Sequence, residues 1–207
     1  MIPLTHARRT LFWLLSLGIA LVSWRFLVLG VHASMEFVEY HAIAHPLAFF
    51  AHVGLAPLAL ALMPFQFWKG LRSRRPALHR RIGRAYALAI LLAGLGALSL
   101  AWHSKAGPVA ASGFFLLGLL WLTSTAAGVW QARARRFAAH RRWMIRSAAL
   151  TFAAVTLRLY LPLGQLLGFD FDRAYTVIAW ACWVPNLLLA EWLLRRDKAP
   201  VPAALPA

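Results

Sequence analysis

Long apolar blocks separated by short polar segments make up most of the chain, and six of these blocks are long enough to cross a bilayer. A helix of about 20 residues rises about 30 Å, the thickness of the hydrocarbon core. We therefore predict an all-α, polytopic membrane bundle of six transmembrane helices. The expected spans are residues 11–30, 47–67, 82–103, 109–130, 143–163 and 174–194.

The two ends of the chain fall outside these spans. Residues 1–10 form a short polar start, and residues 195–207 are basic and then rich in Ala and Pro, which predicts a disordered tail. The first apolar block exceeds the roughly 7–15 residues of a signal-peptide core, so we expect it to remain as a helix.

Composition supports the membrane class and excludes several others. The chain is 61% hydrophobic, against about 45–50% in soluble domains. Its one cysteine, Cys182, rules out an intramolecular disulfide and any CxxC motif. Phosphate-binding loops and nucleophile–base motifs are absent from the sequence, which gives hydrolase and phosphotransferase functions no support.

The 22 Lys and Arg residues, against six Asp and Glu, are placed asymmetrically. In a six-span topology, all basic residues except Arg25, Lys105, Arg158 and Arg173 fall at the N-terminus, the 68–81 and 131–142 loops with the adjoining helix turns, and the C-terminus. The positive-inside rule then predicts that both termini are cytoplasmic. This placement favours contact with anionic membrane lipids over nucleic-acid binding.

A short basic motif occurs twice. Residues 78–86 read LHRRIGRAY, and residues 139–147, sixty-one positions later, read AHRRWMIRS. Each copy follows a basic loop and opens an apolar block. The motif indicates a repeated helical hairpin, with spans two to five as a central four-helix bundle and spans one and six outside it. Orientation pressure on two basic loops is the alternative explanation.

Four histidines fall at span ends or inside spans. His79 and His140 lie at the cytoplasmic ends of two spans, whereas His52 and His103 lie toward the outer face. The 24 residues between His79 and His103 correspond to about 36 Å of helix. We therefore expect one cytoplasmic pair and one outer pair.

A b-type haem in a helical bundle needs two imidazole ligands to its iron from facing helices, together with cations for its propionates. His79 and His140 are the candidate metal ligands, with Arg84 and Arg146 as candidate propionate partners, and His52 with His103 is the candidate outer pair. The alternative is that His79 and His140 are interfacial residues beside arginines that bind lipid phosphates.

Ionisable residues inside a span face the bundle interior or a wet cavity. His52, Arg158 and Arg25 all fall in the outer third of their spans, which predicts a buried polar site that binds a ligand. Asn186, beside Pro185, is a further candidate contact or an interhelical hydrogen bond. The alternative pairs the arginines with acidic residues of the outer loops. His41 and His45 have the i, i+4 spacing of a metal pair, without a third ligand evident in the sequence.

Three stretches together carry a resemblance to a known family: LHRRIGRAY at 78–86, AHRRWMIRS at 139–147 and WACWVPN at 180–186. With His52 and Arg158, they resemble a bacterial family of multi-pass membrane proteins defined as a domain of unknown function. The resemblance covers roughly residues 45–192. It implies an inner-membrane helical protein, and it places His52, His79, His140, Arg158 and Asn186 at signature positions.

More distantly, the plan is similar to the haem bundles of the cytochrome b561 and ferric-reductase group. That group draws its ligands from four helices, whereas the fourth span here has no histidine. The resemblance therefore implies one haem or none. The favoured hypothesis is haem-b-linked electron transfer with a quinone-like or other redox partner. The alternatives are a non-redox protein that binds or moves a small anionic or lipid-like ligand, and a structural membrane partner.

Overall fold

The computed structural model describes residues 6–197, which are almost entirely helical and contain no strand. The prediction of an all-α membrane bundle is confirmed. The elements, in chain order, are α1 (His6–Ser23), α2 (Phe26–Met35), η1 (Glu36–Val38), α3 (Glu39–Ala44), α4 (Pro46–Phe67), α5 (Lys69–Arg74), α6 (Pro76–Trp102), α7 (Gly107–Arg133), α8 (Phe137–Thr151), α9 (Ala153–Leu166), α10 (Phe171–Ala181) and α11 (Val184–Arg196).

Within the described residues, five helical segments are long and apolar enough to cross a membrane, and α1 with the chain to Ala44 makes a bent sixth. The five are α4, α6, α7, the pair α8–α9 and the pair α10–α11. Most helices extend a few residues beyond the predicted spans because polar end turns continue the helix into the interface. The predicted disordered tail from residue 198 onward lies outside the described residues, whereas residues 195 and 196 belong to α11.

Several helices begin where the sequence supplies proline in the first turn, namely α4, α6, α7 and α11. Proline suits this position because its fixed φ matches the helix and its missing N–H has no intrahelical acceptor there. Two connections turn sharply at glycines with positive φ, Gly107 (85°) and Gly168 (77°). Helical hairpins therefore follow from residues visible in the sequence.

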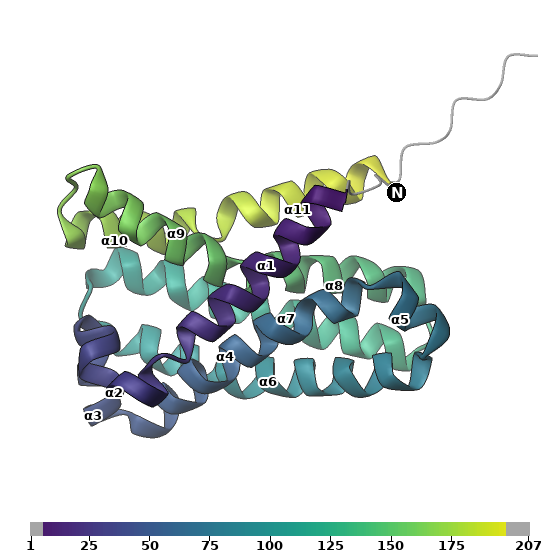
Figure 1. Cartoon of the computed structure of the whole chain (residues 1–207), viewed down its shortest axis with the longest axis horizontal. Helices are drawn as coiled ribbons and strands as arrows, with labels where there is room; N and C mark the ends of the chain where they lie inside the picture. The colour runs from purple at the N-terminus through teal and green to yellow at the C-terminus, as the bar shows by residue number, and fades with distance from the viewer. Residues whose placement is uncertain (1–5, 198–207) are drawn as a thin grey trace, which may run out of the picture.

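Helices α4, α6, α7 and α8 form the centre of the molecule, as predicted for spans two to five. The most extensive packing joins α4 to α6, α7 to α8 and α6 to α7. Helix α1 crosses this bundle obliquely and packs on α4 and α9, while α10 and α11 run along another side (Figure 1). The first and last spans thus lie outside the central bundle.

Helices α6 and α8 run in the same direction with their repeated motifs at the same height. Tyr86 on α6 hydrogen-bonds to Ser147 on α8 over 3.0 Å, and these residues are 61 positions apart. That offset is also the separation of the two motifs in the sequence. The register supports the repeated-hairpin hypothesis. The two connections differ, because the short helix α5 links α4 to α6, whereas a tight turn at Arg135, with a φ of 58°, links α7 to α8.

The first span differs from its prediction. The 11–30 apolar block breaks after Ser23, and the chain bends by 81° between α1 and α2. The indole of Trp24 donates a hydrogen bond to the carbonyl oxygen of Gly54 over 2.9 Å, which anchors the bend on α4. The segment from α2 to α3 then lies at one end of the bundle (Figure 1).

Helices α4 and α6 approach most closely at Gly96. A Cβ at this position would lie 2.5 Å from the backbone carbonyl oxygen of Ala48 and 3.2 Å from the backbone nitrogen of His52. Ala89 and Ala93, on the same helix, are buried. Small residues let helix backbones approach in a membrane, where packing drives association.

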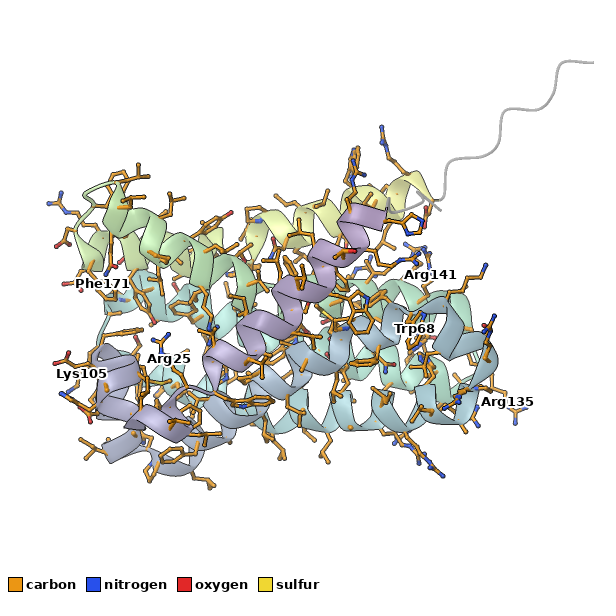
Figure 2. All side chains as sticks on the ribbon, viewed as in Figure 1. Arg25, Trp68, Lys105, Arg135, Arg141 and Phe171 are labelled. Carbon is orange, nitrogen blue, oxygen red and sulfur yellow. The ribbon has the colours of Figure 1, made fainter. Side chains whose placement is uncertain are left out.

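The bundle has two electrostatically different ends. The end with the start of α1, α5, the α7–α8 turn and the end of α11 is called here the basic end. The opposite end, with Glu36, Glu39, Asp170 and Asp172, is the acidic end. Figure 2 labels Trp68, Arg135 and Arg141 at the basic end and Arg25, Lys105 and Phe171 at the acidic end.

Candidate functional site

His79 on α6 and His140 on α8 lie at the same depth near the basic end. His79 lies seven residues before Tyr86, and His140 lies seven residues before Ser147, the two residues that contact each other. Seven residues correspond to two helical turns, so each histidine shares a helix face with the residue it precedes. The two imidazoles lie within range of each other's charge. The structure therefore brings together the predicted cytoplasmic pair, from helices that face one another across the central bundle.

The ring of His140 has a fixed orientation. Its Nδ1 lies 2.8 Å from the carbonyl oxygen of Gly128 on α7. Because that carbonyl accepts, Nδ1 carries the proton, and Nε2 keeps its lone pair free for another partner. In metal sites, a hydrogen bond from the ring nitrogen that does not bind the metal commonly orients the histidine.

Unpaired polar atoms gather around this pair, which we call the His79–His140 site. Nδ1 of His79, Nε2 of Gln66 and Oε1 of Gln131 are buried and have no hydrogen-bond partner among the described residues. These side chains come from α6, α4 and α7, while α8 supplies His140. A buried polar atom without a partner costs about 1–3 kcal/mol, so this cluster is the kind that a bound group satisfies.

Two glycines at this level leave space that flexible side chains occupy. A Cβ on Gly83 would lie 3.1 Å from Oε1 of Gln66, and a Cβ on Gly128 would lie 2.6 Å from Sδ of Met144. Gln66 and Met144 are both unbranched and can rotate away. The site can therefore widen without movement of the helix backbones.

The predicted propionate partners are not directed at this site. Arg84 is exposed, because it is two residues from buried Tyr86 and so falls on the opposite face of α6. Arg146 forms an ion pair with Glu191 on α11, with Nη2 to Oε2 at 3.0 Å. Arg146 and Glu191 also line a cleft of about 230 Å³ between α7, α8 and α11. The structure therefore places Arg84 and Arg146 on faces other than the one that carries the histidine pair.

A buried hydroxyl network, which the sequence interpretation missed, lies two turns deeper than the histidines. Tyr86 Oη lies 2.8 Å from Oγ1 of Thr151, which also accepts from the Trp121 indole over 2.8 Å. Ser147 Oγ lies 2.7 Å from Thr125 Oγ1. The available signal was the same-face, seven-residue spacing from each histidine to Tyr86 and Ser147. The network joins α6, α7 and α8 beneath the site.

The predicted outer pair of His52 and His103 is not formed. Nδ1 of His52 lies 3.0 Å from the carbonyl oxygen of Ala93, whereas His103 is ten residues, or about 15 Å, further along α6. The ring of His103 instead lies against His45, with centroids 3.9 Å apart. One haem iron cannot be shared by His52 and His103 in this arrangement.

His41 and His45 cluster with His103 at the acidic end, without forming a metal centre. Burial, together with the charges of His45, His103 and Lys105, lowers the pKa of His41 to about 4, so its imidazole is neutral at pH 7. Among residues 6–197, no group of three or more His, Cys, Asp or Glu side chains could hold a metal ion. The i, i+4 spacing of His41 and His45 instead brings their rings into an aromatic cluster with His103.

Arg25 and Arg158 lie within electrostatic range of one another toward the acidic end, and His52 lies within range of Arg158. The charges of the two guanidinium groups act on one another, and that of Arg158 acts on His52. Arg25 lines an open pocket of about 370 Å³ between the α2–η1 segment and α9. This pocket is the larger of the two described here.

Asn186 serves helix packing. Its amide donates to the carbonyl oxygen of Cys182 over 3.0 Å and to Oγ1 of Thr156 over 3.2 Å. Thr156 in turn donates to the Cys182 carbonyl. These bonds join α9 to the break between α10 and α11, so the predicted ligand contact at Asn186 is replaced by an interhelical one.

Comparison with known proteins gives a family. The family model described as "Predicted membrane protein (DUF2306)" matches residues 49–194, from the beginning of α4 to near the end of α11. No curated protein and no solved structure matches the chain. The matched region contains the whole central bundle, both copies of the basic motif and the His79–His140 site. The chain therefore belongs to the DUF2306 family of multi-pass membrane proteins.

Proposed function

We propose that this protein binds one b-type haem between His79 and His140 and takes part in electron transfer in the membrane. The observation that carries the proposal is the common register of α6 and α8, which places the two imidazoles at one depth on facing helices. Bis-histidine ligation needs this arrangement. The unpaired buried atoms of His79 and its neighbours add support.

The protein's own residues fit such a group in three respects. The Gly128 carbonyl oxygen holds the His140 ring so that Nε2 is available as a ligand atom. Gly83 and Gly128 keep the inner faces of α6 and α7 open once Gln66 and Met144 rotate. The buried side chains of Tyr86, Trp121 and Thr151 close the site from the middle of the bundle.

Bound haem would supply reversible one-electron chemistry at its iron. The chain's part is to orient both imidazoles and to tune the site through hydrogen bonds and burial. Arg72 and Arg80 lie within electrostatic range of His79 at the basic end. A quinone-like molecule remains the proposed redox partner.

Absorption spectroscopy tests the proposal directly. We expect protein purified in mild detergent from haem-replete cells to show a Soret band that shifts on dithionite reduction, with b-type α and β bands at close to one haem per chain. Pyridine haemochrome analysis would give the stoichiometry. A colourless, monodisperse preparation that also fails to take up added haemin would refute haem binding.

The proposed location is the bacterial inner membrane, with the basic end cytoplasmic. The concentration of arginines at that end supports this orientation, and those residues would contact anionic lipids. We expect a green fluorescent protein fused to the C-terminus to fluoresce, and alkaline phosphatase inserted after Lys105 to be active. Active phosphatase at the C-terminus would reverse the topology.

A further inference from the structure

The acidic end contains two arginines whose charge the protein does not neutralise. Arg25 donates to the backbone carbonyl oxygen of Ser34, and Arg158 donates to that of Ala154 over 3.1 Å. Neither forms an ion pair with any of the described residues. Each guanidinium has five N–H donors, so most of the donors on both side chains remain without a protein acceptor.

An uncompensated pair of like charges here is costly. Arg158 lies on α9 inside a membrane-spanning segment, where an arginine without a counter-charge is costly. The charge of Arg25 adds repulsion. A bound anion would remove both penalties, because its oxygens accept from the free donors and its charge offsets theirs.

The pocket beside Arg25 is lined by both polar and apolar side chains. Arg158, Leu161, Pro162 and Gln165 have the i, i+3, i+4, i+7 spacing of one face of α9, and the last three line the pocket. Arg158 therefore continues the pocket face deeper into the bundle. Phe37 and Phe171 contribute aromatic walls, with ring centroids 5.3 Å apart.

Two acidic residues belong to the segment beside the pocket, Glu36 and Glu39. Glu39 pairs with His32 over 2.8 Å and raises the pKa of that imidazole, chiefly through their hydrogen bond. Glu36 lines the pocket and forms no ion pair with Arg25. The lining therefore carries one arginine and one carboxylate, and the charge of Arg158 on the same face of α9 adds to that of Arg25.

We propose that this pocket binds an amphiphilic anion, namely a carboxylate or phosphate group attached to an apolar chain. The anionic group accepts hydrogen bonds from Arg25 and is drawn inward by Arg158. The apolar chain packs against Leu161 and Phe171 and extends between the helices toward lipid. The volume of about 370 Å³ falls within the 300–1,000 Å³ typical of small-molecule pockets. This site is independent of the proposed haem.

Binding of defined amphiphiles tests the proposal. Protein in neutral maltoside detergent is titrated with oleate or dodecyl phosphate, and its tryptophan fluorescence is followed. In parallel, thermal unfolding is compared in phosphatidylcholine nanodiscs with and without phosphatidylglycerol. We expect saturable oleate or phosphate binding, with Kd raised by at least about tenfold in both Arg25→Gln and Arg158→Gln, since each loses a charge-assisted partner. Arg173→Gln, which alters an exposed arginine at the same end, should bind as the wild type does.

These measurements distinguish a lipid headgroup from a soluble amphiphile as the ligand, and they distinguish loss of binding from loss of folding. Stabilisation by phosphatidylglycerol without oleate or dodecyl phosphate binding would identify a lipid headgroup, whereas binding of the free amphiphiles would identify a soluble acid or phosphate. Equal affinity for uncharged oleyl alcohol, or unchanged affinity in both glutamine variants, would overturn the proposal. If Arg158→Gln does not fold, the affinities of the Arg158→Lys and Arg25→Gln variants test the proposal in its place. Loss of the haem spectrum alone leaves this result unaffected.

Discussion

Replacing His79 or His140 with alanine is expected to lower bound haem at least about tenfold while the helical content stays unchanged, because each variant removes one of two axial ligands. The change should appear as loss of the b-type α band and of the Soret shift on reduction. The two variants should behave alike, since their histidines occupy equivalent positions on parallel helices. Circular dichroism and gel filtration would confirm that the bundle remains folded.

Two controls separate ligation from stability. His103→Ala alters a ring packed on His45 at the acidic end, so the haem content should not change. His79→Met should retain haem and raise its reduction potential, because a methionine and histidine ligand pair favours the reduced iron. Full haem content in both alanine variants would exclude these histidines as ligands. An unchanged potential in His79→Met would point to a structural role for His79.

Helix periodicity explains which site residues the sequence could place. His79 and Tyr86 are seven residues apart and share a face, and the same holds for His140 and Ser147. If Tyr86 and Ser147 point into the bundle, His79 and His140 must point to the same side of their helices. Arg84 lies on the opposite face of α6, so periodicity alone contains the argument against it as a haem contact. The repeated motif thus accounts for the common depth of His79 and His140, whereas Arg84 lies on the other face of its helix.

Other features depended on contacts between distant segments. Glu191 is far from Arg146 in sequence, so nothing in the local pattern indicated their ion pair. The bend after Ser23 interrupts a continuous apolar block and is held by Trp24 reaching the Gly54 carbonyl. Hydropathy measures length and polarity, and therefore cannot locate a bend of this kind. The predicted span consequently extended seven residues too far.

The four-residue spacing of small residues on α6 marks the helix contact only in part. Ala85, Ala89, Ala93 and Ala97 repeat at an interval that favours a close helix approach. Ala89 and Ala93 are buried, but Ala85 is exposed, and the closest approach falls on Gly96, outside that pattern. A strict repeat of four drifts around a helix with 3.6 residues per turn. The contact with α4 therefore lies at Gly96 and not on the row of alanines.

Gly96→Ala is expected to destabilise the protein by roughly 1–3 kcal/mol, the cost of overpacking a close contact. The added Cβ would lie 2.5 Å from the Ala48 carbonyl oxygen, which is backbone and cannot rotate away. Helices α4 and α6 must then separate next to His52, whose ring is bonded to Ala93. The thermal unfolding midpoint in detergent, followed by circular dichroism, measures the loss.

Gly54→Ala provides the matched control for this contact. Gly54 lies on α4, in the same helix pair, and a Cβ there meets no atom within 4 Å. Alanine is the better helix former by about 1 kcal/mol, so this variant should unfold at the same temperature or higher. Because both variants add one methyl group, their difference isolates the α4–α6 contact. Equal midpoints would mean that these helices can separate freely at Gly96, and the close approach would then contribute little to the stability of the central bundle.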